Sequence, residues 1–305
     1  MSEPSQPKTP AGPSRIPPFQ DQQGQPGGFK AVLQLFLVPL SIVIVAGGIF
    51  LTMNFLVGNE SSPEEILDKV ASGDSRRRGQ AAFELSLRLR AEPQLLEDSA
   101  FRARLLSIYE SSEGGGAELR RYLTQVLSSA EFPEAIPALL RATEDQDGET
   151  RLYATAALGN AAAPEAFERL VELTRDADPG VRSVAAASLG NFGDGRAIGP
   201  LEARLNDPAV EVAWNAANAL AHLESTAGEG VLRRMLDESY LSTVAGITDE
   251  QKLQAMLAAV QGLTKLEAAA PDAERRSGLE EIAKMAPYPE VRNAAMRALQ
   301  SQEEG

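Results

Sequence analysis

A repeat whose equivalent positions return at 119, 150, 181 and 212 constrains the fold of this chain more than any other feature of the sequence. Three mostly apolar positions recur at this spacing and stay in step through four copies. They are Leu119, Thr150, Val181 and Val212; Leu123, Ala154, Ala185 and Ala216; and Leu127, Leu158, Leu189 and Leu220. A fixed period of about 31 residues indicates stacked units that bury their apolar faces only against their neighbours. The sequence therefore predicts an extended surface, not one enclosed pocket.

Each unit is expected to contain two α-helices. The spacing of Val181, Ala185 and Leu189 places them on one stripe of a helix. A second stripe recurs upstream at Ala135, Ala166 and Ala197; at Ile136, Phe167 and Ile198; and at Leu139, Leu170 and Leu201. Asp178-Pro179 and Asp207-Pro208 predict an N-cap carboxylate followed by proline, with Asp147 as a looser version of the cap. Gly159 and Gly190 are expected to end the second helix.

The motif Asp-Pro-x-Val-Arg, followed by paired alanines and Leu-Gly at 178–190, resembles the HEAT repeat family in its short bacterial form. The resemblance covers 132–224, returns at 290–299 and is weaker at 74–89. It implies an all-α fold, an α-solenoid of about six to seven HEAT-like helical hairpins over 58–300, used as a protein-binding scaffold. It supplies no catalytic residues, so we expect no enzymatic activity.

An uncharged run precedes the repeats. Ala31 to Val57 spans 27 residues without a charge, which as a helix is about 40 Å long against a hydrocarbon core of about 30 Å. The run predicts one transmembrane helix at 31–57. The alternative is a cleaved secretory signal, which ordinarily has a shorter apolar region after a short basic start. Residues 1–30, rich in Pro, Gln and Gly, are expected to be a disordered tail, and 301–305 a disordered end.

The charges beside this run suggest an orientation. Lys30 adjoins its first end, and Glu60, Glu64 and Glu65 follow the other. Basic residues favour the cytoplasmic side of a span. We therefore expect a single-pass protein of a bacterial inner membrane with its repeat domain outside the cytoplasm.

The net charge limits the possible partners. The chain carries −14, and because residues 1–59 contribute +1, residues 60–305 carry −15. Such a surface disfavours nucleic acids and anionic lipid headgroups. The basic run 76–78 is either a solvated helix start or a contact to lipid headgroups. With no cysteine and only His222 as histidine, we expect no cofactor, no metal site and no catalytic residue.

The candidate partner-binding face consists of second-helix positions that avoid the apolar stripe. These are Arg121, Tyr122, Leu152, Tyr153, Trp214, Asn215, Asn218 and His222. Aromatic and polar groups on one helix face suit protein contacts. In the alternative interpretation, the tyrosines and Trp214 fill grooves between adjacent units. The stretch 240–248 interrupts the period, and insertions of this kind often lie on a binding face.

Two further sequence patterns predict local structure. Arginines recur beside the apolar stripe and are expected to bond to aspartates and carbonyls of neighbouring turns. They are Arg120, Arg151, Arg182 and Arg292. Thr248 and Gln251 have the spacing of a capping box, which predicts a helix start there.

These features favour a membrane-anchored scaffold that docks or assembles protein partners in a membrane or envelope complex. HEAT-like repeats resembling these also occur in phycobilin lyases, so the alternative is a HEAT-like lyase or chaperone for a bound cofactor such as a tetrapyrrole. A passive spacer is the third hypothesis.

Overall fold

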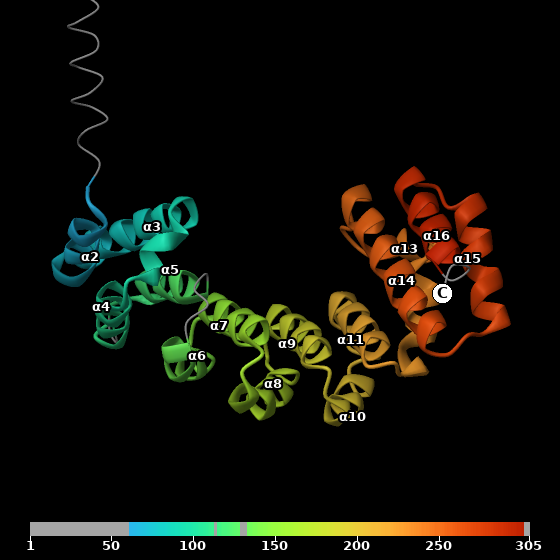
Figure 1. Cartoon of the computed structure of the whole chain (residues 1–305), viewed down its shortest axis with the longest axis horizontal. Helices are drawn as coiled ribbons and strands as arrows, with labels where there is room; N and C mark the ends of the chain where they lie inside the picture. Colours follow the sequence, from blue (N-terminus) through green and yellow to red (C-terminus); the bar gives the residue numbers. More distant parts are fainter. Residues whose placement is uncertain (1–60, 113–114, 129–132, 302–305) are drawn as a thin grey trace, which may run out of the picture. The chain divides into compact units, whose positions relative to one another are not determined.

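A computed structural model describes residues 61–112, 115–128 and 133–301, and these residues form helices joined by short turns without any strand (Figure 1). The helices are α2 (Pro63–Ser72), α3 (Ser75–Ala91), α4 (Ser99–Glu110), α5 (Ala117–Ser128), α6 (Ile136–Ala142), α7 (Gly148–Ala161), α8 (Phe167–Leu173), α9 (Pro179–Phe192), α10 (Ile198–Glu202), α11 (Val210–His222), α12 (Glu229–Met235), α13 (Glu238–Leu241), α14 (Asp249–Ala269), α15 (Ala273–Met285) and α16 (Pro289–Ser301). The fold is an all-α helical-repeat solenoid.

The predicted tail at 1–30 and the predicted transmembrane helix at 31–57 lie outside the described residues. So do residues 302–305 of the disordered end predicted at 301–305, whose first residue is the last of α16. Among the helices that are described, none is both long enough and apolar enough to cross a bilayer.

Seven helical hairpins follow one another within the described residues, which agrees with the six to seven expected. They pair α2 with α3, α4 with α5, α6 with α7, α8 with α9, α10 with α11, α12 with α14, and α15 with α16. The second helix of each hairpin contacts the second helix of the next, and Figure 1 shows α5, α7, α9 and α11 side by side in chain order. The period of the sequence reappears in the structure, because α7, α9 and α11 begin at 148, 179 and 210.

The predicted core is confirmed. Every position of the repeated second-helix stripe, from Leu119 to Leu220, is at most 1% exposed. The upstream stripe is buried as well, apart from the half-buried Ile198. These side chains are buried between the two helices of their own hairpin and against the adjacent hairpins. Burial of apolar surface therefore depends on contacts between units as well as within them.

The expected helix ends at Gly159 and Gly190 are wrong. Both glycines lie inside their helices, and the left-handed exits occur three residues later, at Ala162 (φ 46°) and Gly193 (φ 66°). Glycine near the end of a helical pattern commonly marks such an exit, but these two positions have another function.

Gly159 and Gly190 allow the second helices to approach closely. A Cβ added to Gly159 would lie 2.0 Å from Oγ of Ser188, and one added to Gly190 would lie 2.7 Å from Cα of Ala219. Neither position has room for a methyl group. The contacts therefore join α7 to α9 and α9 to α11 through small residues.

The N-cap expected at Asp207 is also wrong. Asp178 does cap α9 by accepting from the backbone N–H of Gly180 at 2.7 Å, but the cap of α11 is Ala209, which has no side-chain oxygen. Asp207 instead accepts from the backbone N–H of Ala209 at 3.0 Å. In the repeat it is equivalent to Asp176, and not to Asp178, so the period predicts helix starts better than the Asp-Pro dipeptide does.

We expect Gly190→Ala to lower the free energy of unfolding by about 1–3 kcal/mol, because the new methyl group meets the backbone of α11. Gly230→Ala is the matched control, since a Cβ there has no neighbour within 4 Å. It should raise the free energy by about 0.5–1 kcal/mol through helix propensity. Denaturant unfolding followed by circular dichroism measures both. Equal effects of the two substitutions would contradict the close contact at Gly190.

Candidate partner-binding site between α11 and α14

Arginine–aspartate pairs join consecutive hairpins and confirm the bonding predicted for the recurring arginines. The pairs are Arg120 with Asp145, Arg151 with Asp176, and Arg182 with Asp207. Arg182 shows the full pattern: Nη2 lies 2.8 Å from Oδ1 of Asp207, and Nη1 donates to the carbonyl of Asp176 at 3.0 Å. Arg292 likewise donates to the carbonyl of Ala286 at 2.6 Å. These guanidinium groups are engaged within the repeat array.

The same pairs shift the pKa values of their carboxyl groups. Burial raises the pKa of Asp207, but the hydrogen bond from Arg182 and the backbone bond from Ala209 outweigh it and hold this pKa below its ordinary value. The balance is the same at Asp176, where Arg151 supplies the side-chain bond. Folding thus favours the ionised form of both carboxyl groups.

Arg121, predicted for the partner-binding face, is engaged in a similar way. Its Nη2 lies 3.0 Å from Oδ1 of Asp147, the N-cap of α7, and its Nη1 lies 2.9 Å from Oε2 of Glu149. The hydrogen bond with Asp147 raises the pKa of Arg121. The side chain therefore links α5 to α7.

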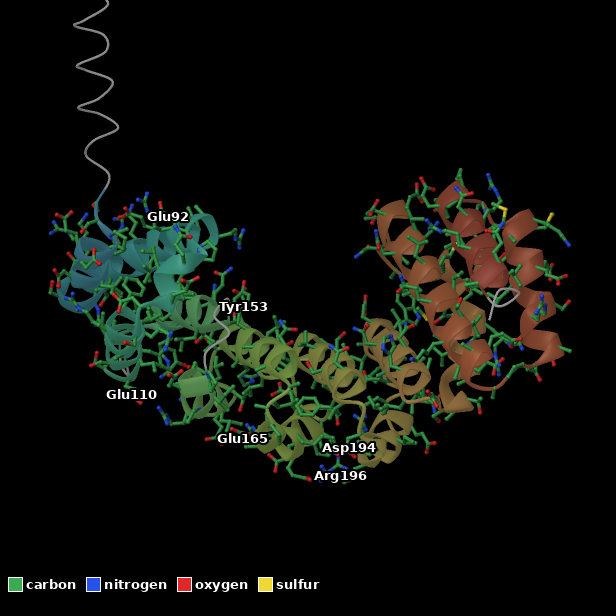
Figure 2. The ribbon with its side chains drawn as sticks, in the orientation of Figure 1. Glu92, Glu110, Tyr153, Glu165, Asp194 and Arg196 are labelled. Carbon is green, nitrogen blue, oxygen red and sulfur yellow. The ribbon has the colours of Figure 1, made fainter. Side chains whose placement is uncertain are left out.

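Three more predicted face residues lie on α5 and α7. Tyr122 is half-buried with its ring 5.3 Å from that of Phe83, and Leu152 is half-buried against the core. Tyr153 is also half-buried, and Figure 2 places it on the opposite side of the helix row from Glu165 and Arg196. None of the three belongs to the lining of the pockets described among the resolved helices.

Trp214, Asn215 and Asn218 do come together, in a pocket of about 390 Å³ between the N-terminal halves of α11 and α14. The other lining residues are Glu211, Met235, Val244, Ala245, Gly246, Ile247, Gln251, Gln254, Ala255 and Ala258. His222, the last residue of α11, is exposed and lies outside this lining. One wall is apolar, and the polar groups are amides and a single carboxylate.

The indole of Trp214 is largely buried but incompletely bonded. The residue is 9% exposed and belongs to the apolar cluster that includes Val231 and Met235. Its Nε1 is buried and has no hydrogen-bond partner among the residues that the structure describes. A buried donor left unpaired costs about 1–3 kcal/mol. The ring thus fills a groove, as the alternative interpretation proposed, while its N–H stays unsatisfied.

The two asparagines are held by bonds within the repeats. Nδ2 of Asn215 donates to Oγ of Ser183 on α9 at 2.7 Å, and Nδ2 of Asn218 donates to the carbonyl of Trp214 at 3.1 Å. A Cβ added to Gly262 would lie 2.9 Å from Oδ1 of Asn218. The helices α11 and α14 therefore touch at Asn218, and the pocket lies on the N-terminal side of that contact.

The predicted insertion supplies another side of the pocket. Val244 to Ile247, between α13 and α14, belong to the lining, and Gly246 takes the left-handed conformation at φ 76°. The predicted capping box is confirmed: Oγ1 of Thr248 accepts from the N–H of Gln251 at 3.2 Å, and the N–H of Thr248 donates back at 2.9 Å. The cap fixes where α14 begins, and so where the loop meets α11.

Sequence reasoning missed Glu211, Met235, Gln251 and Gln254 as members of the lining. A signal for Glu211 was present, because it occupies the same repeat position as Glu118 and Glu149. The other three depend on the placement of α12 and α14, for which the interrupted period gives no guide.

The family model for HEAT repeats matches residues 103–184 and 168–248. The chain contains HEAT repeats. These matches cover α5 to α12 entirely, and hence the hairpin that carries Trp214. No curated protein matches the chain.

Among the solved structures that resemble this chain, a phycocyanin lyase complex shares its fold. The complex of CpcE and CpcF of phycocyanin lyase from Nostoc sp. PCC7120 is similar with a TM-score of 0.51 and 21% identity, over 79% of this chain and 95% of that one. An engineered protein gives a TM-score of 0.44 at 21% identity, over 80% of this chain and 68% of its own. Human deoxyhypusine hydroxylase gives a TM-score of 0.34 at 16% identity, over 80% of this chain and 85% of its own. At 21% identity, the likeness to the lyase complex concerns the fold alone.

Acid should weaken the array by protonating the paired aspartates. Because the folded pKa of Asp207 is lowered, its contribution is fully present above the unfolded pKa of about 4 and is lost as pH falls through the folded value. We expect Asp207→Asn to lower the free energy of unfolding at pH 7 by about 1–3 kcal/mol, because Arg182 loses a charged partner. As the pH falls from about 5 towards 2, the free energy of unfolding should then decrease less in the variant than in the parent.

Denaturant unfolding across this pH range measures the effect. The control is Glu165→Gln, at an exposed carboxylate in the turn before α8, which should keep the parent profile. An Asp207→Asn protein with the parent's acid dependence would show that this pair does not stabilise the array.

Proposed function

We propose that the chain is a membrane-anchored HEAT-repeat scaffold that docks or assembles protein partners, which are membrane or envelope proteins. The observation that carries the proposal is the α11–α14 pocket, where Trp214, two asparagines and the insertion at 240–248 meet. An apolar wall with a few fixed polar groups suits a binding site. The lining includes no Ser, Thr, Cys, Lys or His, so it offers no nucleophile–base pair, and docking accounts for it better than catalysis does.

The anchor in this proposal is the uncharged run at 31–57. We place the protein in a bacterial inner membrane as a single-pass protein with its HEAT repeats outside the cytoplasm, since Lys30 adjoins the first end of the run and carboxylates follow the second. The charge of −15 on residues 60–305 supports a role near a membrane without adsorption to it, because anionic headgroups repel such a surface. The repeats would then be free to meet a protein.

The alternative, a HEAT-like lyase or chaperone for a tetrapyrrole, is favoured by the fold likeness to the phycocyanin lyase complex. The composition of the pocket lining argues against this alternative. A tetrapyrrole carries carboxylates, which Arg or Lys would bind, and the lining contains no cationic residue. A visible absorption band that copurifies with the protein would favour the lyase. For a passive spacer, deleting residues 61–301 would leave the recovery of every partner unchanged.

Photo-crosslinking in native membranes tests the proposal. p-Benzoylphenylalanine replaces Gln254, an exposed residue of the pocket lining, in the full-length chain. The membranes are washed with high salt and then with alkaline carbonate before illumination. We expect the chain to stay in the washed membranes and to give a discrete protein adduct. The matched control carries the crosslinker at Glu165, an exposed residue before α8 that does not belong to the pocket lining, and should give no such adduct.

Each part of the proposal can fail separately. Release of the full-length chain by the salt wash would overturn the membrane anchor. Equal adducts from positions 254 and 165, or none from 254, would overturn docking at this face. Survival of the repeat domain when protease is added to intact spheroplasts would reverse the proposed orientation.

A further inference from the structure

Two polar groups of the α11–α14 pocket have no partner among the described residues, and their chemistry indicates what binds there. The first is a hydrogen-bond donor. Nε1 of Trp214 is buried without a partner in a residue that is 9% exposed and lines the pocket. This atom is also closed to solvent, so a ligand that brings an acceptor oxygen reaches it only after a small movement of the lining. It would then satisfy the donor and recover most of the cost of burying it.

The second is the carboxylate of Glu211. Two repeats earlier, the equivalent carboxylate of Glu149 is paired with Arg121 at 2.9 Å. The residue equivalent to Arg121 is Ser183, so the repeat supplies no guanidinium opposite Glu211. Within the described residues Glu211 is exposed and has no ion pair, and nothing else in the lining is cationic. The carboxylate is therefore open to a positive group from outside.

The rest of the lining suits a polypeptide in extended form. Met235, Ile247 and Ala255 supply an apolar wall. Nε2 of Gln254 is held by Glu250 at 2.8 Å, and Nδ2 of Asn215 is held by Ser183. Their amide oxygens can therefore accept from backbone N–H groups. Main-chain bonds with a pocket for alternate side chains are a common mode of peptide recognition.

We propose that this pocket binds an extended, basic segment of a partner protein. A backbone carbonyl of the segment accepts the hydrogen bond of Trp214 Nε1, a Lys or Arg side chain pairs with Glu211, and an apolar side chain of the segment lies against Met235 and Ile247. The inference rests on the proposed docking function and names the chemistry of the partner. The charge of −15 on residues 60–305 favours the encounter with a basic segment over long range.

Trp214 is the single tryptophan of the chain, so its indole resonance reports on this site alone. The probes are two pools of fluorescein-labelled octapeptides built from Ala, Val, Ser and Gly, one with Lys and Arg added and the other with Asp and Glu. Full-length protein labelled with ¹⁵N-tryptophan is titrated with each pool. We expect the basic pool to bind, measured by anisotropy, and to move the indole N–H resonance downfield, while the acidic pool does neither.

Three variants locate the binding energy. Trp214→Phe keeps an aromatic ring but removes the hydrogen-bond donor. It should lower the affinity for the basic pool about 2- to 10-fold. Glu211→Gln should lower the affinity for the basic pool about 2- to 5-fold. Glu118→Gln, the matched control, changes the same register three repeats earlier and outside the pocket, and should leave binding unchanged. Circular dichroism and denaturant unfolding check that each variant is folded.

Several results would overturn the inference. They are equal binding of the acidic pool, equal losses for the substitutions at 211 and 118, and binding of the basic pool with an unmoved indole resonance. If the basic pool does not bind while the crosslinker at Gln254 still captures a protein, the docking function is supported and the basic-segment proposal is wrong. If both fail, the proposed function falls with it.

Discussion

Close contact between small residues on successive second helices is the constraint on which the rest of the structure depends. Gly159 meets Ser188, and Gly190 meets Ala219, at distances that leave no space for an added methyl group. Because these helices approach so closely at a fixed spacing, Arg151 and Arg182 each reach an aspartate of the next hairpin. Packing sets the distance between hairpins, and the ion pairs then fix their registration.

Much of this arrangement could be predicted from the sequence because it is periodic. The buried stripe, the caps at Asp147 and Asp178 and the bonded arginines all recur with the period of the repeat, so a misjudged residue in one copy is corrected by the next. The helical-repeat fold follows from the same pattern. The transmembrane helix at 31–57 rests on composition alone and stays a prediction.

The errors arose where a local signal competed with the period or with packing. Gly190 resembles a helix terminator, and only the position of α11 shows that it is a contact residue. Asp207-Pro208 resembles a cap, although the period assigns that position to Ala209. The ion pairs of Arg121 with Asp147 and Glu149 did not follow from the period, and its place on the partner-binding face stays a prediction. The burial of Trp214 could not be judged, since it depends on α14, whose start is set by a non-periodic insertion.

The candidate site lies where this regularity ends. Between α12 and α14 the chain adds α13 and a loop, and α14 has 21 residues where α11 has 13. The helices α14 and α11 contact each other at Gly262 and Asn218, and their N-terminal halves enclose the pocket. Trp214, whose N–H has no partner among the described residues, lines this pocket. The interruption of the repeat thus creates the features that a docking site requires.

The central claim is that Trp214 is held in the core of this junction with its N–H unpaired. Amide spectroscopy of the ¹⁵N-indole group in the free, full-length protein tests it most directly. The account predicts one indole resonance, at the upfield position of an N–H without an acceptor, that exchanges slowly with deuterated solvent. An indole that exchanges as fast as a solvated tryptophan, or one already shifted downfield by an acceptor in the free protein, would contradict it.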